Sequence, residues 1–216
     1  GDPRVVELPR LLWLPILHGI ILRSRPAKSA AKYATIWTPE GSPLKVHTER
    51  QAKLLKGLLG ERGHKIPEDL LIDWAMRYQN PSIPSVLDRL VAQGATEIVI
   101  LPLYPQYAGS TTASTEDAVN TWLARRKQPP AIRWVKDYPT DPGYIGALAA
   151  SIREHWQAHG RGEKLIMSFH GIPQRSVDRG DPYAGQCHAT AQALEDAHDA
   201  RRQRLGVPDV GVDRLL

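Results

Sequence analysis

The sequence predicts an α/β protein in which parallel strands alternate with helices. Four short apolar segments are typical of buried strands, and helical segments of about a dozen residues separate them. Alternation at this spacing favours βαβ units with helices packed on parallel sheets. The chain has 216 residues, of which 42% are hydrophobic and 24% charged. This composition is that of a globular protein with one large core or two smaller ones.

Each predicted element has its own local signal. The strands are the apolar runs Leu70–Met76, Glu97–Leu103, Ala131–Lys136 and Lys164–Phe169. Ser42-Pro43 supplies a cap and a proline at a first helical position, while Gly94 and Gly160 mark helix ends. The predicted helices are Lys45–Leu59, Ser82–Gln93, Thr115–Lys127, Tyr144–His159 and Tyr183–Arg204.

The segment Asp137–Gly143 (DYPTDPG) is rich in proline and turn formers and is the most plausible domain boundary. We therefore predict a first domain over residues 1–138 and part of a second over residues 139–216. A doubly wound domain normally opens with a strand, whereas two or three helices come first here, and no βα unit follows the last helix. We expect both ends of the fold to be incomplete.

Cysteine content and charge narrow the class of protein. The single cysteine, Cys187, excludes a disulfide framework and any four-cysteine metal or iron–sulfur site within this chain, and it favours a reducing compartment. The formal net charge is +5, and the basic residues are scattered. Because no basic stripe is present, we expect no nucleic-acid partner. An anionic small substrate and an anionic membrane surface both fit the charge.

The most apolar run is Leu11–Leu22 (LLWLPILHGIIL), which is too short to span a bilayer and contains Pro15 and His18. Its composition is typical of a buried helix or helix pair. The alternative is an apolar lip at a cleft or a membrane surface, because arginines flank the run on both sides. The residues alone favour the buried helix.

Three predicted strands end in side chains suited to binding or catalysis. The carboxyl ends of parallel strands share one rim of a sheet, where such folds bind ligands. Tyrosine offers a flat apolar face with a polar tip, and arginine can clamp a carboxylate. Each residue alone is equally typical of an ordinary turn, but three such strand ends favour a functional site. The candidates are Arg77 and Tyr78 after the first strand, Tyr104, Tyr107, Ser110 and Thr111 after the second, and His170 after the fourth.

Other histidines carry weaker signals. His155 and His159 stand four residues apart on a predicted helix, a spacing that can bind metal, but no glutamate follows the first as a zinc protease requires. We interpret both as surface residues, and His188 beside Cys187 is a weaker case still.

Four motifs together resemble the ferrochelatase family, and they occur in the family's order. They are GSPL at 41–44, AMRYQNPSI at 75–83, LYPQYAGSTTAST at 103–115 and SFHGIPQRSVDRGDPY at 168–183. The resemblance covers residues 2–194 and is to the proteobacterial form of the enzyme. It implies a chelatase-like fold of two doubly wound, Rossmann-like parallel-sheet domains.

The resemblance implies a lyase that inserts ferrous iron into protoporphyrin IX in the last step of haem synthesis. Iron would be a substrate, with no permanently bound cofactor and no iron–sulfur cluster. His170 occupies the family's catalytic, metal-site histidine position, and histidine suits that task because its pKa lies near neutrality and its neutral nitrogen binds divalent iron. Leu11–Leu22 matches the family's apolar lip, which favours peripheral contact of a cytoplasmic protein with the inner membrane. The porphyrin cleft would be lined by Arg77, Tyr78, Tyr104, Tyr107, Ser110 and Thr111.

Two features depart from the family. The chain lacks the family's opening strand and porphyrin-facing loop, and nothing after Leu194 matches the segment that carries the glutamate opposite the histidine. Glu195 stands on a predicted helix, and residues 195–216 diverge from the family, so we expect impaired activity. The alternatives are a related cobalt-type chelatase and a non-catalytic porphyrin-binding remnant. The turn around His170 favours the iron enzyme.

Overall fold

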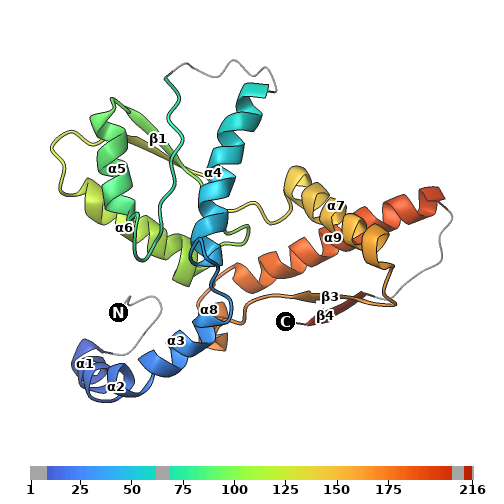
Figure 1. The fold of residues 1–216 in the computed structure, drawn as a ribbon, viewed down its shortest axis with the longest axis horizontal. Coiled ribbons are helices and arrows are strands. Elements are labelled where there is room, and N and C mark those ends of the chain that lie inside the picture. The colour runs from blue at the N-terminus through green and yellow to red at the C-terminus, as the bar shows by residue number, and fades with distance from the viewer. Residues whose placement is uncertain (1–8, 62–68, 206–211, 216) are drawn as a thin grey trace. The chain divides into compact units, whose positions relative to one another are not determined.

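The computed structural model describes residues 9–61, 69–205 and 212–215, and it shows a mixed α/β architecture (Figure 1). The chain divides into two compact units, each assembled from two segments. The first unit comprises residues 1–98 and 116–131, and the second comprises residues 99–115 and 132–216. A domain division at residues 138–139 stays a prediction.

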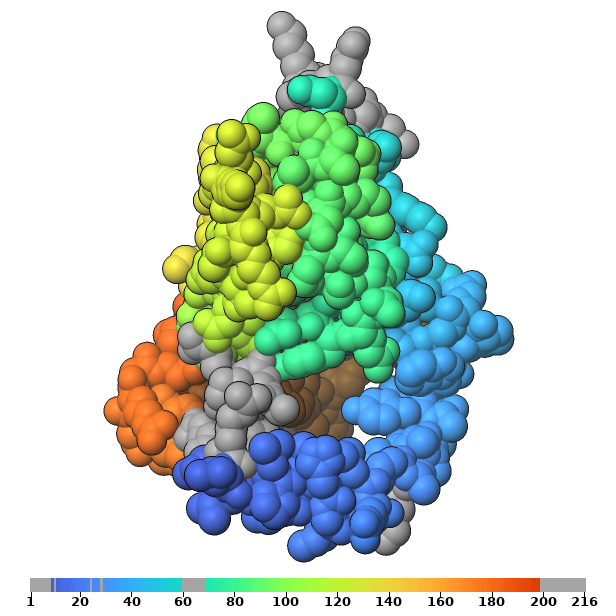
Figure 2. All heavy atoms as spheres, turned by 90° about the vertical axis from the view of Figure 1, so that its left-hand side faces the viewer, coloured from blue at the N-terminus to red at the C-terminus, as the bar shows by residue number. Residues whose placement is uncertain are grey.

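Short helices open the first unit: α1 (Arg10–Ile16), the π-helix η1 (Leu17–Ile21), α2 (Leu22–Ser24) and α3 (Pro26–Ala34). The helical prediction for residues 11–22 is confirmed, but the buried interpretation is wrong. Leu11 is 89% exposed, Leu12 62% and Ile20 64%. A run that is apolar on every side is buried only where other elements surround it. Figure 2 shows these helices in blue.

Helix α4 (Pro43–Glu61) begins as predicted, with Pro43 at its first position. Ser42 Oγ accepts a hydrogen bond from Lys45 N at 3.2 Å, which satisfies one of the amides left unpaired at a helix start. Before it, Thr38 and Gly41 close a tight turn through two backbone hydrogen bonds of 3.0 Å. Gly41 has a φ of +124°, a conformation that favours glycine. The GSPL motif is therefore a turn followed by a capped helix.

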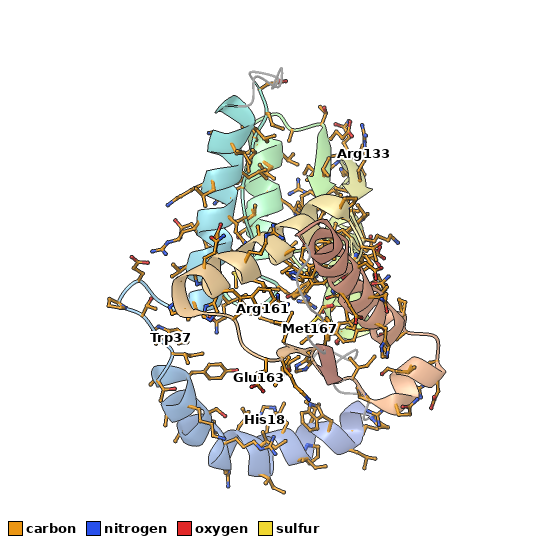
Figure 3. All side chains as sticks on the ribbon, turned by 90° about the vertical axis from the view of Figure 1, so that its right-hand side faces the viewer. His18, Trp37, Arg133, Arg161, Glu163 and Met167 are labelled. Atoms are coloured by element: carbon orange, nitrogen blue, oxygen red, sulfur yellow. The ribbon has the colours of Figure 1, made fainter. Side chains whose placement is uncertain are left out.

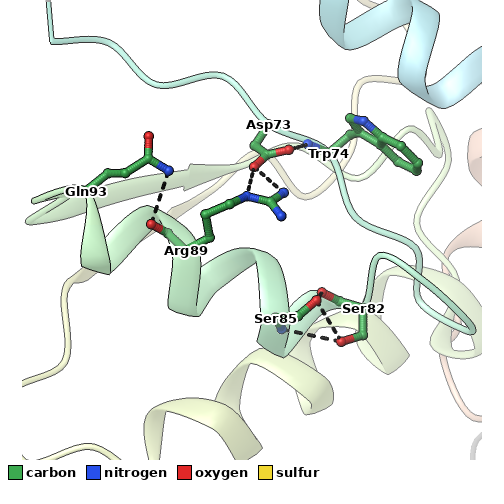
Figure 4. Close-up of polar contacts among 6 residues, drawn as sticks. All are labelled: Asp73, Trp74, Ser82, Ser85, Arg89 and Gln93. Atoms are coloured by element: carbon green, nitrogen blue, oxygen red, sulfur yellow. Dashed lines mark hydrogen bonds and ion pairs between the residues drawn. The ribbon is translucent and has the colours of Figure 1, made fainter.

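The segment Leu70–Met76 is not a strand, so that prediction is wrong. Met76 N donates to Pro81 O at 2.8 Å, but no strand in the described part of the chain pairs with residues 70–75. A strand exists only where a neighbouring segment satisfies its backbone groups, and apolar composition alone does not supply that neighbour. Asp73 anchors the segment, because its carboxylate accepts a hydrogen bond from Arg89 Nε at 2.8 Å (Figure 4).

Helix α5 (Ile83–Ala92) has the predicted start and end. Ser82 Oγ accepts from Ser85 N at 3.3 Å (Figure 4), and Gly94 follows the helix with a φ of +94°. On helix α6 (Ser114–Leu123), Trp122 Nε1 donates to Asp88 Oδ1 of α5 at 2.7 Å. The buried apolar residues of this unit include Ile83, Val86, Leu87, Ile98, Val119 and Trp122.

The strands form two parallel pairs: β1 (Glu97–Ile100) with β2 (Ala131–Trp134), and β3 (Leu165–Ser168) with β4 (Val212–Leu215). Ala131 N donates to Thr96 O at 2.9 Å, and Val135 N donates to Ile100 O at 3.0 Å, so β1 and β2 advance in the same direction. The pairing of β3 with β4 is also parallel. The parallel α/β prediction is therefore confirmed. Three of the predicted strands form and end early, while β4 lies where no strand was expected.

The core of the second unit lies where helices α7 (Pro142–His159) and α9 (Tyr183–Leu205) pack together (Figure 1). Asp141 Oδ1 caps α7 by accepting from Tyr144 N at 2.9 Å, and Gly160 follows its last turn with a φ of +82°. Figure 3 labels Met167 on β3, the strand that this core supports. The buried cluster consists of Ala149, Met167, Ala191 and Leu194. The short helix α8 (Gln174–Asp178) follows β3.

Candidate functional site

The candidate site lies in the second unit, where the segments that follow β1, β2 and β3 meet the first half of α9. These segments are residues 101–109, 135–139 and 169–173. Ligands of parallel α/β folds bind beyond the carboxyl ends of the strands. The site therefore has the location that the strand-end residues predict.

The segment after β1 leads through Tyr104 and Tyr107 into η2 (Gly109–Ala113), a π-helix that precedes α6. Gln106 is buried, and its Nε2 donates to Thr190 Oγ1 at 2.8 Å. Tyr107 N donates to Gln186 Oε1 at 2.6 Å. Because both partners belong to α9, the segment is held at two consecutive residues, through the side chain of Gln106 and the backbone of Tyr107. Tyr104 stays 38% exposed and Tyr107 partly exposed.

The same two residues of α9 also hold the segment after β2. Gln186 Nε2 donates to Asp137 Oδ2 at 3.1 Å, and Thr190 Oγ1 lies 2.7 Å from Pro139 O. Gln186 and Thr190 are four residues apart, so they lie on one face of the helix. One helical face thus ties together two strand-end segments.

The turn after β3 carries His170, which is exposed. Its backbone N–H donates to the hydroxyl of Tyr183, in the first turn of α9, at 3.2 Å. That hydroxyl also hydrogen-bonds Cys187, which is fully buried. The backbone of the histidine is fixed to α9 while the residue stays accessible to a ligand.

The groups beneath this turn are uncharged at neutral pH. Burial raises the pKa of the Cys187 thiol, and the hydrogen bond from Tyr183 opposes this only in part. Burial also raises the pKa of the Tyr183 hydroxyl, and its bond to Cys187 acts in the same direction. The pKa values of Tyr138 and Tyr144, whose rings meet edge to face at 5.6 Å, are raised chiefly by burial as well. The Cys187 thiol and these tyrosine hydroxyls are therefore protonated and uncharged at neutral pH.

The predicted site residues fall in both units. Tyr104, Tyr107, Ser110, Thr111 and His170 belong to the second unit, where α9 holds the segments of Tyr107 and His170. Arg77 and Tyr78 belong to the first unit, in which the Arg77 guanidinium lies 4.7 Å from the centre of the Tyr78 ring.

Several structural residues of the site are missing from the prediction, among them Asp181, Tyr183, Gln186 and Thr190. Gln186 and Thr190 are two polar residues four positions apart on a predicted helix, and this spacing is the signal that could have identified them. Their partners Tyr107 and Gln106 are 79 and 84 positions away in sequence, however, so no local pattern indicates these contacts. Asp181 stands in a Gly-Asp-Pro turn that marks a loop without indicating its partner.

The two histidines His155 and His159 are surface residues, as interpreted. His155 and His159 are exposed and stack with ring centroids 4.4 Å apart, and His188 is exposed on α9. Within the described ranges, no group of three or more His, Cys, Asp and Glu side chains is placed to hold a metal ion. Glu195 lies on α9, in agreement with the sequence prediction.

Parallel strands with a histidine, tyrosines and hydroxyls beyond their ends define an α/β protein with a candidate ligand site at the strand ends. The family model described as Ferrochelatase matches residues 1–207, and the chain belongs to this family. It is 60% identical over 196 residues to a ferrochelatase of Methylibium petroleiphilum, covering 91% of this chain and 53% of that protein. It is 58% identical to one of Polaromonas sp. over 207 residues, covering 96% and 55% respectively. The chain spans about half the length of the curated relatives it matches.

Among the residues that the structure describes, no helix combines the length and the apolar character needed to cross a bilayer.

Proposed function

We propose that this chain forms porphyrin- and iron-binding parts of a ferrochelatase, a lyase that inserts ferrous iron into protoporphyrin IX to make protohaem. The observation that carries the proposal is the convergence of strand-end segments on α9, which ties the turn of His170 and the segment of Tyr107 to one helix. The family membership and the relatives named ferrochelatase support it. Iron is the substrate, and the proposal includes no permanently bound cofactor.

His170 is the residue that we assign to the metal. Insertion requires that iron be held while its waters leave, and that two pyrrole protons be taken from the macrocycle. A neutral imidazole can bind divalent iron or accept a proton near neutral pH. The exposed position of His170, on a backbone fixed to α9, suits either role. The chain spans about half the length of its relatives, so we expect slow turnover from the chain alone.

The porphyrin contacts are assigned by chemistry. A macrocycle needs flat apolar faces, and its two propionates need cations or hydroxyl donors. Tyrosine rings supply the faces, hydroxyls supply donors, and arginine can pair with a propionate in a bidentate manner. The residues assigned are Tyr104, Tyr107, Ser110 and Thr111 from the second unit, and Arg77 and Tyr78 from the first.

Titration of protoporphyrin IX with the purified chain tests the proposal. We expect saturable quenching of porphyrin fluorescence, and Tyr107→Ala should weaken the affinity by about threefold to tenfold because one ring contact is lost. The control is Tyr33→Ala, which truncates a tyrosine that is 59% exposed in the first unit and is not assigned to the site. Equal affinity of the Tyr107→Ala and unsubstituted chains would contradict the assignment.

The metal that the chain inserts distinguishes the ferrochelatase function from the two alternatives, a cobalt-type chelatase and a non-catalytic porphyrin-binding protein. The porphyrin-loaded chain is incubated without oxygen with ferrous iron or with cobalt, and insertion is followed by absorbance. Faster insertion of iron supports the ferrochelatase function, and faster insertion of cobalt supports a related chelatase. Binding without any insertion supports a non-catalytic porphyrin-binding protein.

We also propose that the exposed apolar side chains of residues 11–22 make peripheral contact with the inner membrane from the cytoplasm. Six leucine and isoleucine side chains of this run, on the helices α1, η1 and α2, are between 39% and 89% exposed. Arg23 and Arg25 follow directly and are exposed, which suits the headgroups of an anionic bilayer. Apolar insertion with adjacent cations is the usual basis of interfacial helix binding.

Vesicle sedimentation tests the membrane proposal. We expect the chain to bind phosphatidylglycerol vesicles, and the double substitution Leu11→Ser with Leu12→Ser should weaken binding at least about tenfold, because burying one leucine contributes roughly 1.5–3 kcal/mol. The matched control is Leu54→Ser, which alters a leucine that is 71% exposed on α4. Loss of binding in the control, or none in the double variant, would contradict the proposal.

A further inference from the structure

We infer that Asp181 is a positioning residue that couples the segment of Tyr107, Ser110 and Thr111 to the turn of His170. The inference rests on the proposed function, because it concerns the relative placement of the porphyrin-side and metal-side residues. Asp181 stands in the turn between α8 and α9 and is partly buried.

The two oxygens of the Asp181 carboxylate hold two different segments. Oδ2 accepts a hydrogen bond from Gly109 N at 2.8 Å, and Oδ1 accepts one from Tyr183 N at 3.0 Å. Hydrogen bonds to an ionised carboxylate are stronger than those between neutral groups. Gly109 is the first residue of η2, so the first bond fixes the start of the helix that carries Ser110 and Thr111.

Glycine at position 109 allows this close approach. A Cβ atom there would lie 3.2 Å from Asp181 Oδ2, which is tighter than an ordinary van der Waals contact. Any larger residue would push the carboxylate away from the backbone amide that it accepts from. Substitution of Gly109 is therefore a second way to weaken the hydrogen bond between Gly109 N and Asp181 Oδ2 without changing Asp181.

Tyr183 extends the connection to the histidine. Its backbone amide is held by Asp181, and its hydroxyl accepts from His170 N at 3.2 Å. A continuous path of three hydrogen bonds therefore runs from Gly109 through Asp181 and Tyr183 to His170. Pro182 restrains the turn by fixing its own φ, and Gly180 permits the φ of +90° that the turn requires.

The functional consequence is a fixed separation between the porphyrin-side segment, which carries Tyr107, Ser110 and Thr111, and the metal-side turn of His170. If either bond to Asp181 is lost, the start of η2 and the His170 turn stay joined only through the other contacts with α9, so their separation is held less tightly. A misplacement of about 1 Å can lower the rate on the order of a hundredfold, even when every reacting group is present. Binding of the macrocycle should change less, because the segment of Tyr104 and Tyr107 keeps its own hydrogen bonds to Gln186 and Thr190 of α9.

The test uses the full-length Methylibium petroleiphilum relative with substitutions at the matching positions. We expect Asp181→Ala to lower kcat for iron insertion by about tenfold to a hundredfold, with the KM for protoporphyrin within about threefold. Asp181→Asn retains one acceptor oxygen and should lose less. The matched control is Asp141→Ala, which also removes an aspartate that accepts from a backbone amide in the second unit, at 2.9 Å. It should lower Tm without lowering kcat.

Gly109→Ala provides an independent variant if Asp181→Ala does not fold. We expect it to lower kcat as well, and its effect in combination with Asp181→Asn should be less than the product of the two, because both disturb one contact. An unchanged kcat in Asp181→Asn and Gly109→Ala, together with loss of turnover in His170→Ala, would overturn this inference alone. Full turnover in His170→Ala would overturn the proposed function.

Discussion

His170→Ala, made at the matching position of the full-length Methylibium petroleiphilum relative, is expected to lower iron insertion by about a hundredfold or more. The side chain is the one that we assign to holding ferrous iron or accepting the pyrrole protons, and loss of a group that transfers protons typically costs 10² to 10⁴ in rate, to order of magnitude. Porphyrin affinity should stay within about threefold, since a residue that acts on the metal contributes little to binding the ring. Insertion is followed by haem absorbance, and affinity by fluorescence quenching.

A matched histidine variant controls for this result. His188→Ala removes an exposed histidine of α9, in the same unit, that is not assigned to the site. It should leave turnover unchanged. Comparable turnover of His170→Ala and the unsubstituted enzyme would show that the strand-end histidine does not perform the chemistry.

Met167→Ala in the 216-residue chain is expected to lower the free energy of unfolding by about 2–5 kcal/mol, the usual cost of truncating a large buried side chain. Met167 is 9% exposed and packs with Ala149 of α7 and with Ala191 and Leu194 of α9. The cavity would lie beneath β3, the strand that leads to His170. Denaturant unfolding followed by circular dichroism measures the change.

The adjacent residue of the same strand supplies the control. Ile166 is 61% exposed, because successive residues of a strand point to opposite faces. Ile166→Ala should therefore cost less than about 1 kcal/mol. Equal losses from the two variants would show that the core described for the second unit does not support β3.

Much of the fold follows from local sequence signals. Ser42-Pro43, Ser82, Gly94 and Gly160 identify helix ends, and the structure places helix ends at each of them. These signals act through the residue itself or through a partner three positions away, so the chain specifies them without reference to its distant parts. The strand-end placement of His170 and Tyr107 follows in the same way from the pattern of apolar runs.

Other features depend on distant partners. Leu70–Met76 has the composition of a strand but pairs with no strand of the described chain, and the apolar residues 11–22 form helices that are exposed where a core was expected. The residues that hold the site together, Asp181, Gln186 and Thr190, have no signature of their own. Their partners Gly109, Tyr107 and Gln106 lie 72 to 84 positions away in sequence.

The sequence alone was thus sufficient for the helix ends, the parallel α/β class and the family, because each depends on neighbouring residues or on a motif that is continuous in the sequence. The assignment of side chains to the chemistry stays a prediction. Whether an apolar segment is paired, buried or exposed, and which polar groups of α9 hold the strand ends, required the folded molecule. The physical reason is that burial and hydrogen bonding between distant residues are defined only once packing has brought those residues together.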